Sequence, residues 1–185
     1  MATASRKTST RAPAKRAPAR RASGSDALSL LRADHRAVSE LFAQYEKSRS
    51  ATKKSELVAQ ICLELTVHAQ IEEEIFYPEV ETALRDKELV PEARVEHATL
   101  KELIAQIKGK QPGDPMFEAR VQVLSEYVKH HVKEEQNEMF PKVRTSRLDL
   151  EDLGRRLSER KEELKASPDL LEAPPVPATR AMAEA

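Results

Sequence analysis

Between residues 26 and 167 the apolar side chains recur at alternating steps of three and four, which is the spacing of one face of an α-helix. Good helix formers dominate this region, and no stretch shows the strict alternation of a half-buried strand. Gly109, Pro112, Gly113 and Pro115 interrupt the pattern once. The pattern predicts helices over 26–49, 52–85, 88–108, 115–145 and 150–165, the second bent or broken near Pro78 and the fourth disturbed at Pro141.

Short connections join the four long segments, so consecutive helices are expected to lie antiparallel. The sequence therefore predicts an all-α fold, an up-down-up-down four-helix bundle with the short fifth helix packed outside it or capping one end. The first helix is expected to start at Asp26, with Ser25 as its N-cap. Residues 1–25 and 168–185 are poor in large apolar side chains, so we expect two disordered tails around a bundle over 26–167.

Histidines occupy positions within the predicted apolar stripes. Along the first helix the stripe reads Leu28, Leu31, His35, Val38, Phe42 and Tyr45, which points His35 into the bundle. The same construction on the other three long helices places five more polar side chains inside: His68, Glu72, His97, His131 and Glu135. Counted from the connections, His35 and His68 lie about 1.5 Å apart in height, and His97 and His131 about 6 Å apart. The six side chains are therefore expected to converge.

The two halves of the bundle repeat one another. His68 and Glu72 precede Pro78 by the same offsets at which His131 and Glu135 precede Pro141, with an aromatic residue before each proline. A duplicated helical hairpin explains this repetition.

Six converging polar side chains need compensation in the core, because each unpaired group costs about 1–3 kcal/mol and a domain is stable by only about 5–15 kcal/mol. Mutual hydrogen bonds could offset part of this cost. Imidazole and carboxylate side chains that converge in a bundle are also the ligands that a borderline transition metal such as iron, manganese or zinc requires. We therefore interpret the cluster as a metal site.

The pattern of His35, then His68-x-x-x-Glu72, then His97, then His131-x-x-x-Glu135 resembles the bacterial hemerythrin-like proteins, the HHE cation-binding domain family, over residues 26–145. The resemblance implies two non-haem iron ions bridged by Glu72 and Glu135, with histidines in terminal positions and zinc or manganese as other occupants. Oxygen-carrying hemerythrins have a further histidine where Lys101 stands here. Water or one of several side chains could complete the shell: Glu64, Glu73, Tyr127, His130 or Glu134.

Three functions follow from this interpretation. The first is binding of O2 or a related small ligand, for oxygen, iron or redox sensing or storage. The second is a di-iron enzyme that consumes peroxide or nitric oxide, because the iron near Lys101 would lack one ligand. The third is a structural or interaction bundle that binds zinc or no metal.

Charge is unevenly distributed, although the formal net charge is zero. Residues 1–25 hold seven lysines and arginines and no acid, so this arm could contact nucleic-acid phosphates without reading sequence, or could simply solubilise the chain. Cys62 is the single cysteine, and no apolar run has the length of a membrane span or signal peptide. These features favour a cytoplasmic protein that does not enter a membrane.

Overall fold

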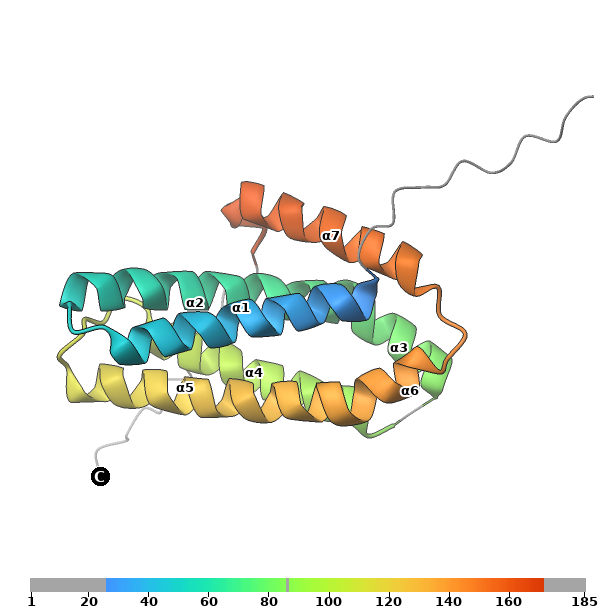
Figure 1. Cartoon of the computed structure of the whole chain (residues 1–185), viewed down its shortest axis with the longest axis horizontal. Helices are drawn as coiled ribbons and strands as arrows, with labels where there is room; N and C mark the ends of the chain where they lie inside the picture. Colours follow the sequence, from blue (N-terminus) through green and yellow to red (C-terminus); the bar gives the residue numbers. More distant parts are fainter. Residues whose placement is uncertain (1–25, 86, 172–185) are drawn as a thin grey trace, which may run out of the picture.

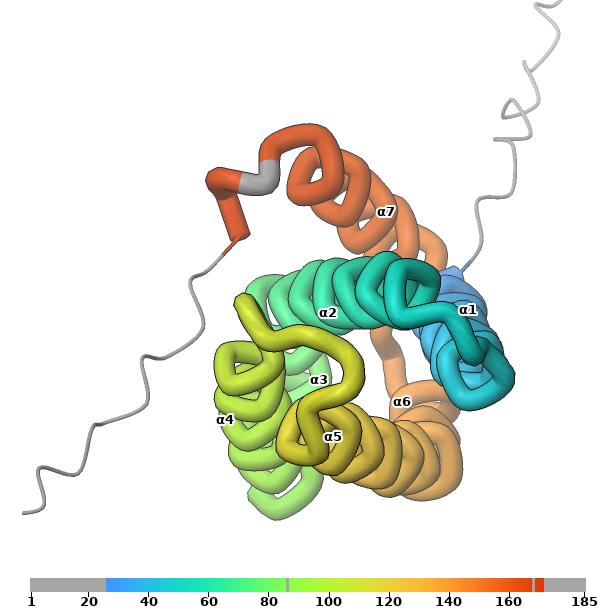
Figure 2. Tube along the Cα trace, turned by 90° about the vertical axis from the view of Figure 1, so that its left-hand side faces the viewer, coloured from blue at the N-terminus to red at the C-terminus, as the bar shows by residue number. Residues whose placement is uncertain are grey.

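The computed structural model describes residues 26–85 and 87–171. Its four long helices are α1 (Ala27–Lys47), α2 (Ala51–Ile71), α4 (Leu89–Ile107) and α5 (Pro115–Glu134). They run alternately up and down around a common core (Figures 1 and 2). The predicted four-helix bundle is therefore confirmed. The basic arm and most of the predicted C-terminal tail lie outside the described residues, and residues 168–170 form a short 3-10 turn, η3 (Pro168–Leu170).

Helix starts are set by side chains that accept hydrogen bonds from free backbone N–H groups. Asp26 caps α1 by accepting from the backbone N of Ser29 at 2.8 Å, so the cap lies one position after the predicted Ser25. Asp114 caps α5, and Pro115 follows it at the first helical position, where a missing N–H costs nothing.

Each predicted disturbance at a proline is a π-helical turn that begins before the proline. These turns are η1 (Glu72–Phe76), followed by α3 (Tyr77–Leu84), and η2 (Glu135–Met139), followed by α6 (Phe140–Arg144). In each turn the closing hydrogen bond spans five residues, from the N–H of Tyr77 to the carbonyl of Glu72 and from Phe140 to Glu135. Residues five apart therefore share one face here, which places Tyr77 beside Glu72.

Helix α7 (Leu150–Ala166) packs on the outside of the bundle along α1 and α2 (Figure 1). This is one of the two placements that the sequence predicted. Leu153, Leu157 and Leu164 are buried in the contact. Lys161 on the same helix donates to Asp34 of α1. Of the helices in the described part of the chain, none combines the length and apolar character needed to cross a bilayer.

The apolar core has two parts. One cluster, around Phe76 and Tyr77, fills the end of the bundle where α3, α6 and α7 meet. The other, around Phe42 and Phe117, fills the end near the α1–α2 and α4–α5 connections. The predicted histidines and glutamates lie between the two clusters.

We expect Leu157→Ala to lower the free energy of unfolding by about 2–4 kcal/mol, because Leu157 has no exposed surface and its loss would leave a cavity under α7. Urea denaturation followed by circular dichroism measures the change. The exposed neighbour Ser158→Ala is the control and should shift stability by less than about 0.5 kcal/mol. Equal effects of both substitutions would contradict the proposed packing.

Candidate metal centre

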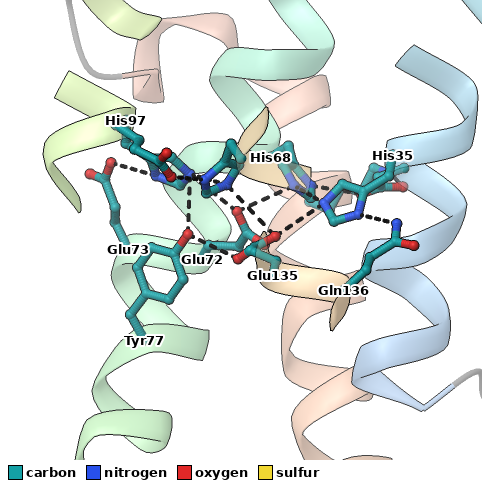
Figure 3. A network of polar contacts seen from close by, with 12 residues as sticks. His35, His68, Glu72, Glu73, Tyr77, His97, Glu135 and Gln136 are labelled. Carbon is teal, nitrogen blue, oxygen red and sulfur yellow. Dashed lines mark hydrogen bonds and ion pairs between the residues drawn. The ribbon is translucent and has the colours of Figure 1, made fainter. Parts of the chain in front are cut away.

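All six sequence-predicted residues are buried in the core. Figure 3 labels five of them, His35, His68, Glu72, His97 and Glu135, which face one another at one level of the bundle. None of the six is more than 6% exposed, and Glu72 has no exposed surface. One histidine comes from each long helix, and Glu72 and Glu135 are the first residues of the two π-helical turns. The structure therefore brings these side chains together, as the sequence predicted.

The four imidazoles form two pairs through their Nε2 atoms. His35 Nε2 lies 3.0 Å from His68 Nε2, and His97 Nε2 lies 3.1 Å from His131 Nε2. A tight pair of nitrogen donors therefore faces the centre from each half of the bundle.

The two carboxylates connect these pairs. Glu72 Oε2 lies 3.2 Å from His68 Nε2 and 3.5 Å from His97 Nε2. Glu135 Oε2 lies 3.3 Å from His35 Nε2 and 3.7 Å from His131 Nε2. Each carboxylate thus contacts one histidine of each pair, the position of a ligand shared by two ions.

The outer nitrogen of each histidine lies near a polar side chain, and all but that of His68 are within hydrogen-bond distance of it. His97 Nδ1 lies 3.0 Å from Glu73 Oε1, and His131 Nδ1 lies 2.7 Å from Glu96 Oε2. The other two contacts join His68 Nδ1 to Asp34 Oδ2 at 3.5 Å and His35 Nδ1 to the Gln136 amide at 3.0 Å. At His97 and His131 the carboxylate partner accepts from Nδ1 and leaves Nε2 free to face the centre, as in metal-bound histidines. At His35 the Gln136 amide nitrogen donates to Nδ1 instead.

The centre leaves buried oxygens without hydrogen bonds. Both carboxylate oxygens of Glu72 and Oε2 of Glu135 are inaccessible to solvent and have no hydrogen-bond partner. A buried charge without a partner is costly, and metal coordination is one of the few ways to satisfy it. The donor set and the unsatisfied oxygens therefore fit a pair of bound cations.

The close packing of the buried side chains also changes the pKa values of Glu72 and Glu135. Burial, and then repulsion from Glu135, raises the pKa of Glu72 well above its ordinary value. Burial also disfavours ionisation of Glu135, but the imidazoles of His131 and His35 outweigh it and lower the pKa of that carboxyl. The two carboxyl groups are therefore driven in opposite directions, which disfavours ionisation of both at once in the absence of a cation.

Tyr77 is a member of the centre that the sequence analysis did not identify. Its hydroxyl donates to Glu135 Oε1 at 3.1 Å and lies 3.2 Å from His97 Nε2. It reaches this point because the π-helical turn places it below Glu72. The aromatic residue before Pro78 was the available signal, but an α-helical count assigns it a different face.

The structure places the other candidates for a missing ligand elsewhere. Lys101 donates to Glu73 at 2.6 Å, so both side chains lie on the Nδ1 side of His97 and face away from the centre. Glu64 pairs with Lys165 of α7. Tyr127, His130 and Glu134 are exposed or half-buried on the surface of α5. Tyr77 thus replaces these candidates as the nearest additional donor.

A small cavity of about 10 Å³ adjoins the four histidines. Its remaining walls are largely apolar: Val38, Leu65, Ala69, Leu100, Val128 and Val132. About one water-sized molecule fits such a volume.

Comparison with known proteins agrees with this geometry. Residues 26–143 match the family described as hemerythrin HHE cation binding domain. A DNA nickase from Nostoc sp. (strain PCC 7120 / SAG 25.82 / UTEX 2576) is 34% identical over 117 residues, which cover 63% of this chain and 33% of that protein. This chain therefore spans about a third of the length of that relative.

A solved structure shares the fold. The crystal structure of a hemerythrin HHE cation binding domain-containing protein, a homologue from Mycobacterium kansasii, matches with a TM-score of 0.66. The two are 22% identical, and the match covers 77% of this chain and 88% of the other.

We expect Glu72→Gln to raise the free energy of unfolding of the metal-free protein by about 1–3 kcal/mol at pH 7, because it replaces a buried carboxyl whose ionisation is disfavoured in the folded protein by a group that never ionises. The pKa of Glu72 is raised above its ordinary 4.5, so its ionisation opposes folding. The gain should therefore be small below pH 4.5 and grow as pH rises. Denaturation of chelator-treated protein at several pH values measures it. A loss of stability at pH 7, or an equal gain in the exposed control Glu102→Gln, would contradict the prediction.

Proposed function

The chain belongs to the hemerythrin HHE cation-binding domain family, and on this premise we propose that its buried centre holds two iron ions bridged by Glu72 and Glu135. The observation that carries the proposal is the position of the two Oε2 atoms, each in contact with one histidine from either pair. One iron would take His35 and His68, and the other His97 and His131. Tyr77 would supply an oxygen donor on the side of His97.

The chemistry of the donors favours iron. Imidazole suits zinc, copper, iron and nickel, whereas carboxylate oxygens suit harder ions such as manganese. A bundle core that combines both, with two carboxylates shared between positions, is the arrangement of di-iron carboxylate proteins. Zinc and manganese remain the alternative occupants in our proposal.

We further propose that the centre binds O2 or a related small ligand for sensing or storage. The small cavity beside the histidines would give a small ligand a place next to the centre, and its largely apolar walls would favour an uncharged molecule. Iron would supply a reversible change of oxidation state and an open coordination position. The chain would orient the imidazoles through Asp34, Glu73, Glu96 and Gln136.

Turnover of peroxide or nitric oxide is the second candidate function. It is favoured by Lys101, which stands where oxygen-carrying hemerythrins have a histidine and is bound to Glu73. Steady-state peroxide consumption that requires both iron and His97 would support turnover. Its absence in the iron-loaded protein would leave ligand binding as the function.

Elemental analysis of protein made in iron-replete cells tests the metal proposal, together with the visible spectrum before and after anaerobic reduction. We expect about two irons per chain, with charge-transfer bands that bleach on reduction and return in air. Stoichiometric zinc, or little metal of any kind, would overturn the iron proposal.

Adjacent histidines provide a matched pair of variants. His131→Ala should reduce the iron content to about one ion per chain or less, because His131 is buried and faces the centre. His130→Ala removes an imidazole that is 60% exposed and should leave the content unchanged. Equal iron in both variants would contradict the assignment of His131.

Tyr77→Phe tests the oxygen donor. The variant should keep both irons, because four histidines and two carboxylates remain, but its visible bands should shift if the hydroxyl binds the metal. Phe140, the residue at the same position in the other half, packs against His35 and already has no hydroxyl. An unchanged spectrum in Tyr77→Phe would show that Tyr77 acts only as a hydrogen-bond donor.

We also propose that the basic arm, residues 1–25, contacts nucleic acid. Its seven cations support this, as does the likeness to a relative named a DNA nickase. Fluorescence anisotropy with a random-sequence duplex compares the full chain with residues 26–185. Only the full chain should bind, with a log–log salt slope of up to about −6. Equal weak binding by both would contradict the proposal.

A further inference from the structure

A narrow cavity of about 20 Å³ lies between α4 and α5 and reaches the candidate metal centre from the side. His131 and Glu135 form its inner wall. Four further carboxylates line it, and they become more buried toward the centre: Glu92 and Glu138 are exposed, and Glu96 and Glu134 are half-buried. Acidic groups therefore continue from the surface to a bridging carboxylate.

The half-buried carboxylates are arranged as ligands. Glu96, His130 and Glu134 each offer an atom within 4.8 Å of the others. His130 Nε2 lies 3.1 Å from Glu134 Oε1 and 3.5 Å from Glu96 Oε1. The second oxygen of Glu96 holds His131, so this outer group directly adjoins the centre.

The inner end of the cavity holds a buried carboxylate oxygen that contacts histidines but accepts no hydrogen bond. Glu135 is 2% exposed, and its Oε2 atom has no hydrogen-bond partner. This oxygen would attract a cation inward once the cation has passed the outer carboxylates. No lysine or arginine is found among the described residues that line the cavity.

In the described part of the chain, the other sides of the bundle do not offer unpaired carboxylates in the same way. Lys129 and Lys133 line the opening between α1 and α5 that leads to His35, so this side is positively charged. On the α1–α2 side, Asp34 is paired with Lys161 of α7. Between α2 and α4, Glu73 is paired with Lys101. A divalent cation would be repelled on the α1–α5 side and would meet neutralised ion pairs on the next two, whereas the α4–α5 side attracts it.

We propose that the acidic cavity between α4 and α5 is the entrance through which a divalent cation reaches the buried centre, with Glu96 and Glu134 as transient ligands on the way. His130 lies beside these two carboxylates in the adjoining surface groove and can serve as a third ligand at the mouth. This inference rests on the proposed two-metal function. It assigns Glu92 and Glu138 to capture of the cation and gives them no role in holding it afterwards.

Stopped-flow loading of the metal-free full chain with Co²⁺ tests the entrance, since the visible bands of bound Co²⁺ report arrival at the histidines. We expect the double variant Glu92→Gln/Glu138→Gln to load about tenfold more slowly at low ionic strength and to lose most of its salt dependence. The final Co²⁺ stoichiometry should equal that of the unmodified protein. The control is Glu40→Gln/Glu56→Gln, which removes two exposed charges from α1 and α2 and should load at the unmodified rate.

Three results would overturn the entrance. They are an unchanged loading rate in Glu92→Gln/Glu138→Gln, an equal slowing in the control, and a rate that does not depend on Co²⁺ concentration, which would mean that opening of the bundle limits entry. Failure of the unmodified protein to bind Co²⁺ at equilibrium would instead overturn the two-metal proposal. Thermal melts of both variants confirm that these surface changes leave the fold intact.

Discussion

Two carboxylates buried without enough hydrogen bonds are the constraint around which this bundle is organised. Three oxygens of Glu72 and Glu135 are inaccessible and unsatisfied, and they lie between two apolar clusters that cannot compensate them. Replacing such groups by apolar ones of similar volume often gives an equally or more stable core, so their presence here fits a site for a bound cation. The surrounding histidines, their Nδ1 partners and the two π-helical turns all serve to hold donors around that point.

The two halves of the centre are alike in plan and different in chemistry. Behind His97 stands an ionised pair, because hydrogen bonds from His97 and Lys101 outweigh burial and lower the pKa of Glu73 to about 2. The equivalent position behind His35 is the neutral Gln136. A charged partner makes an imidazole a stronger donor than a neutral one, so the two histidine pairs are inequivalent as ligand sets.

Much of this arrangement could be predicted because it depends on helical periodicity. The step of three and four that placed Leu31 and Val38 in the core also placed His35 there, and the same reasoning held for the other three helices. For α7 the sequence predicted two placements, outside the bundle or across one end. Its leucine stripe shows that the helix packs against the bundle but does not show which helices it contacts. Tyr77 was missed because a five-residue turn shifts every later residue to a new face, and nothing before Pro78 announces that shift.

The π-helical turns also make the internal repeat of the chain exact at the centre. Each contains one residue more than an α-helical turn would, and both begin at a buried glutamate and end just before an aromatic residue and a proline. The same local geometry therefore directs one carboxylate and one aromatic ring inward from each half of the bundle. The pseudo-symmetry ends at the ring itself, because Tyr77 carries a hydroxyl that reaches His97 Nε2 whereas Phe140 only packs against His35.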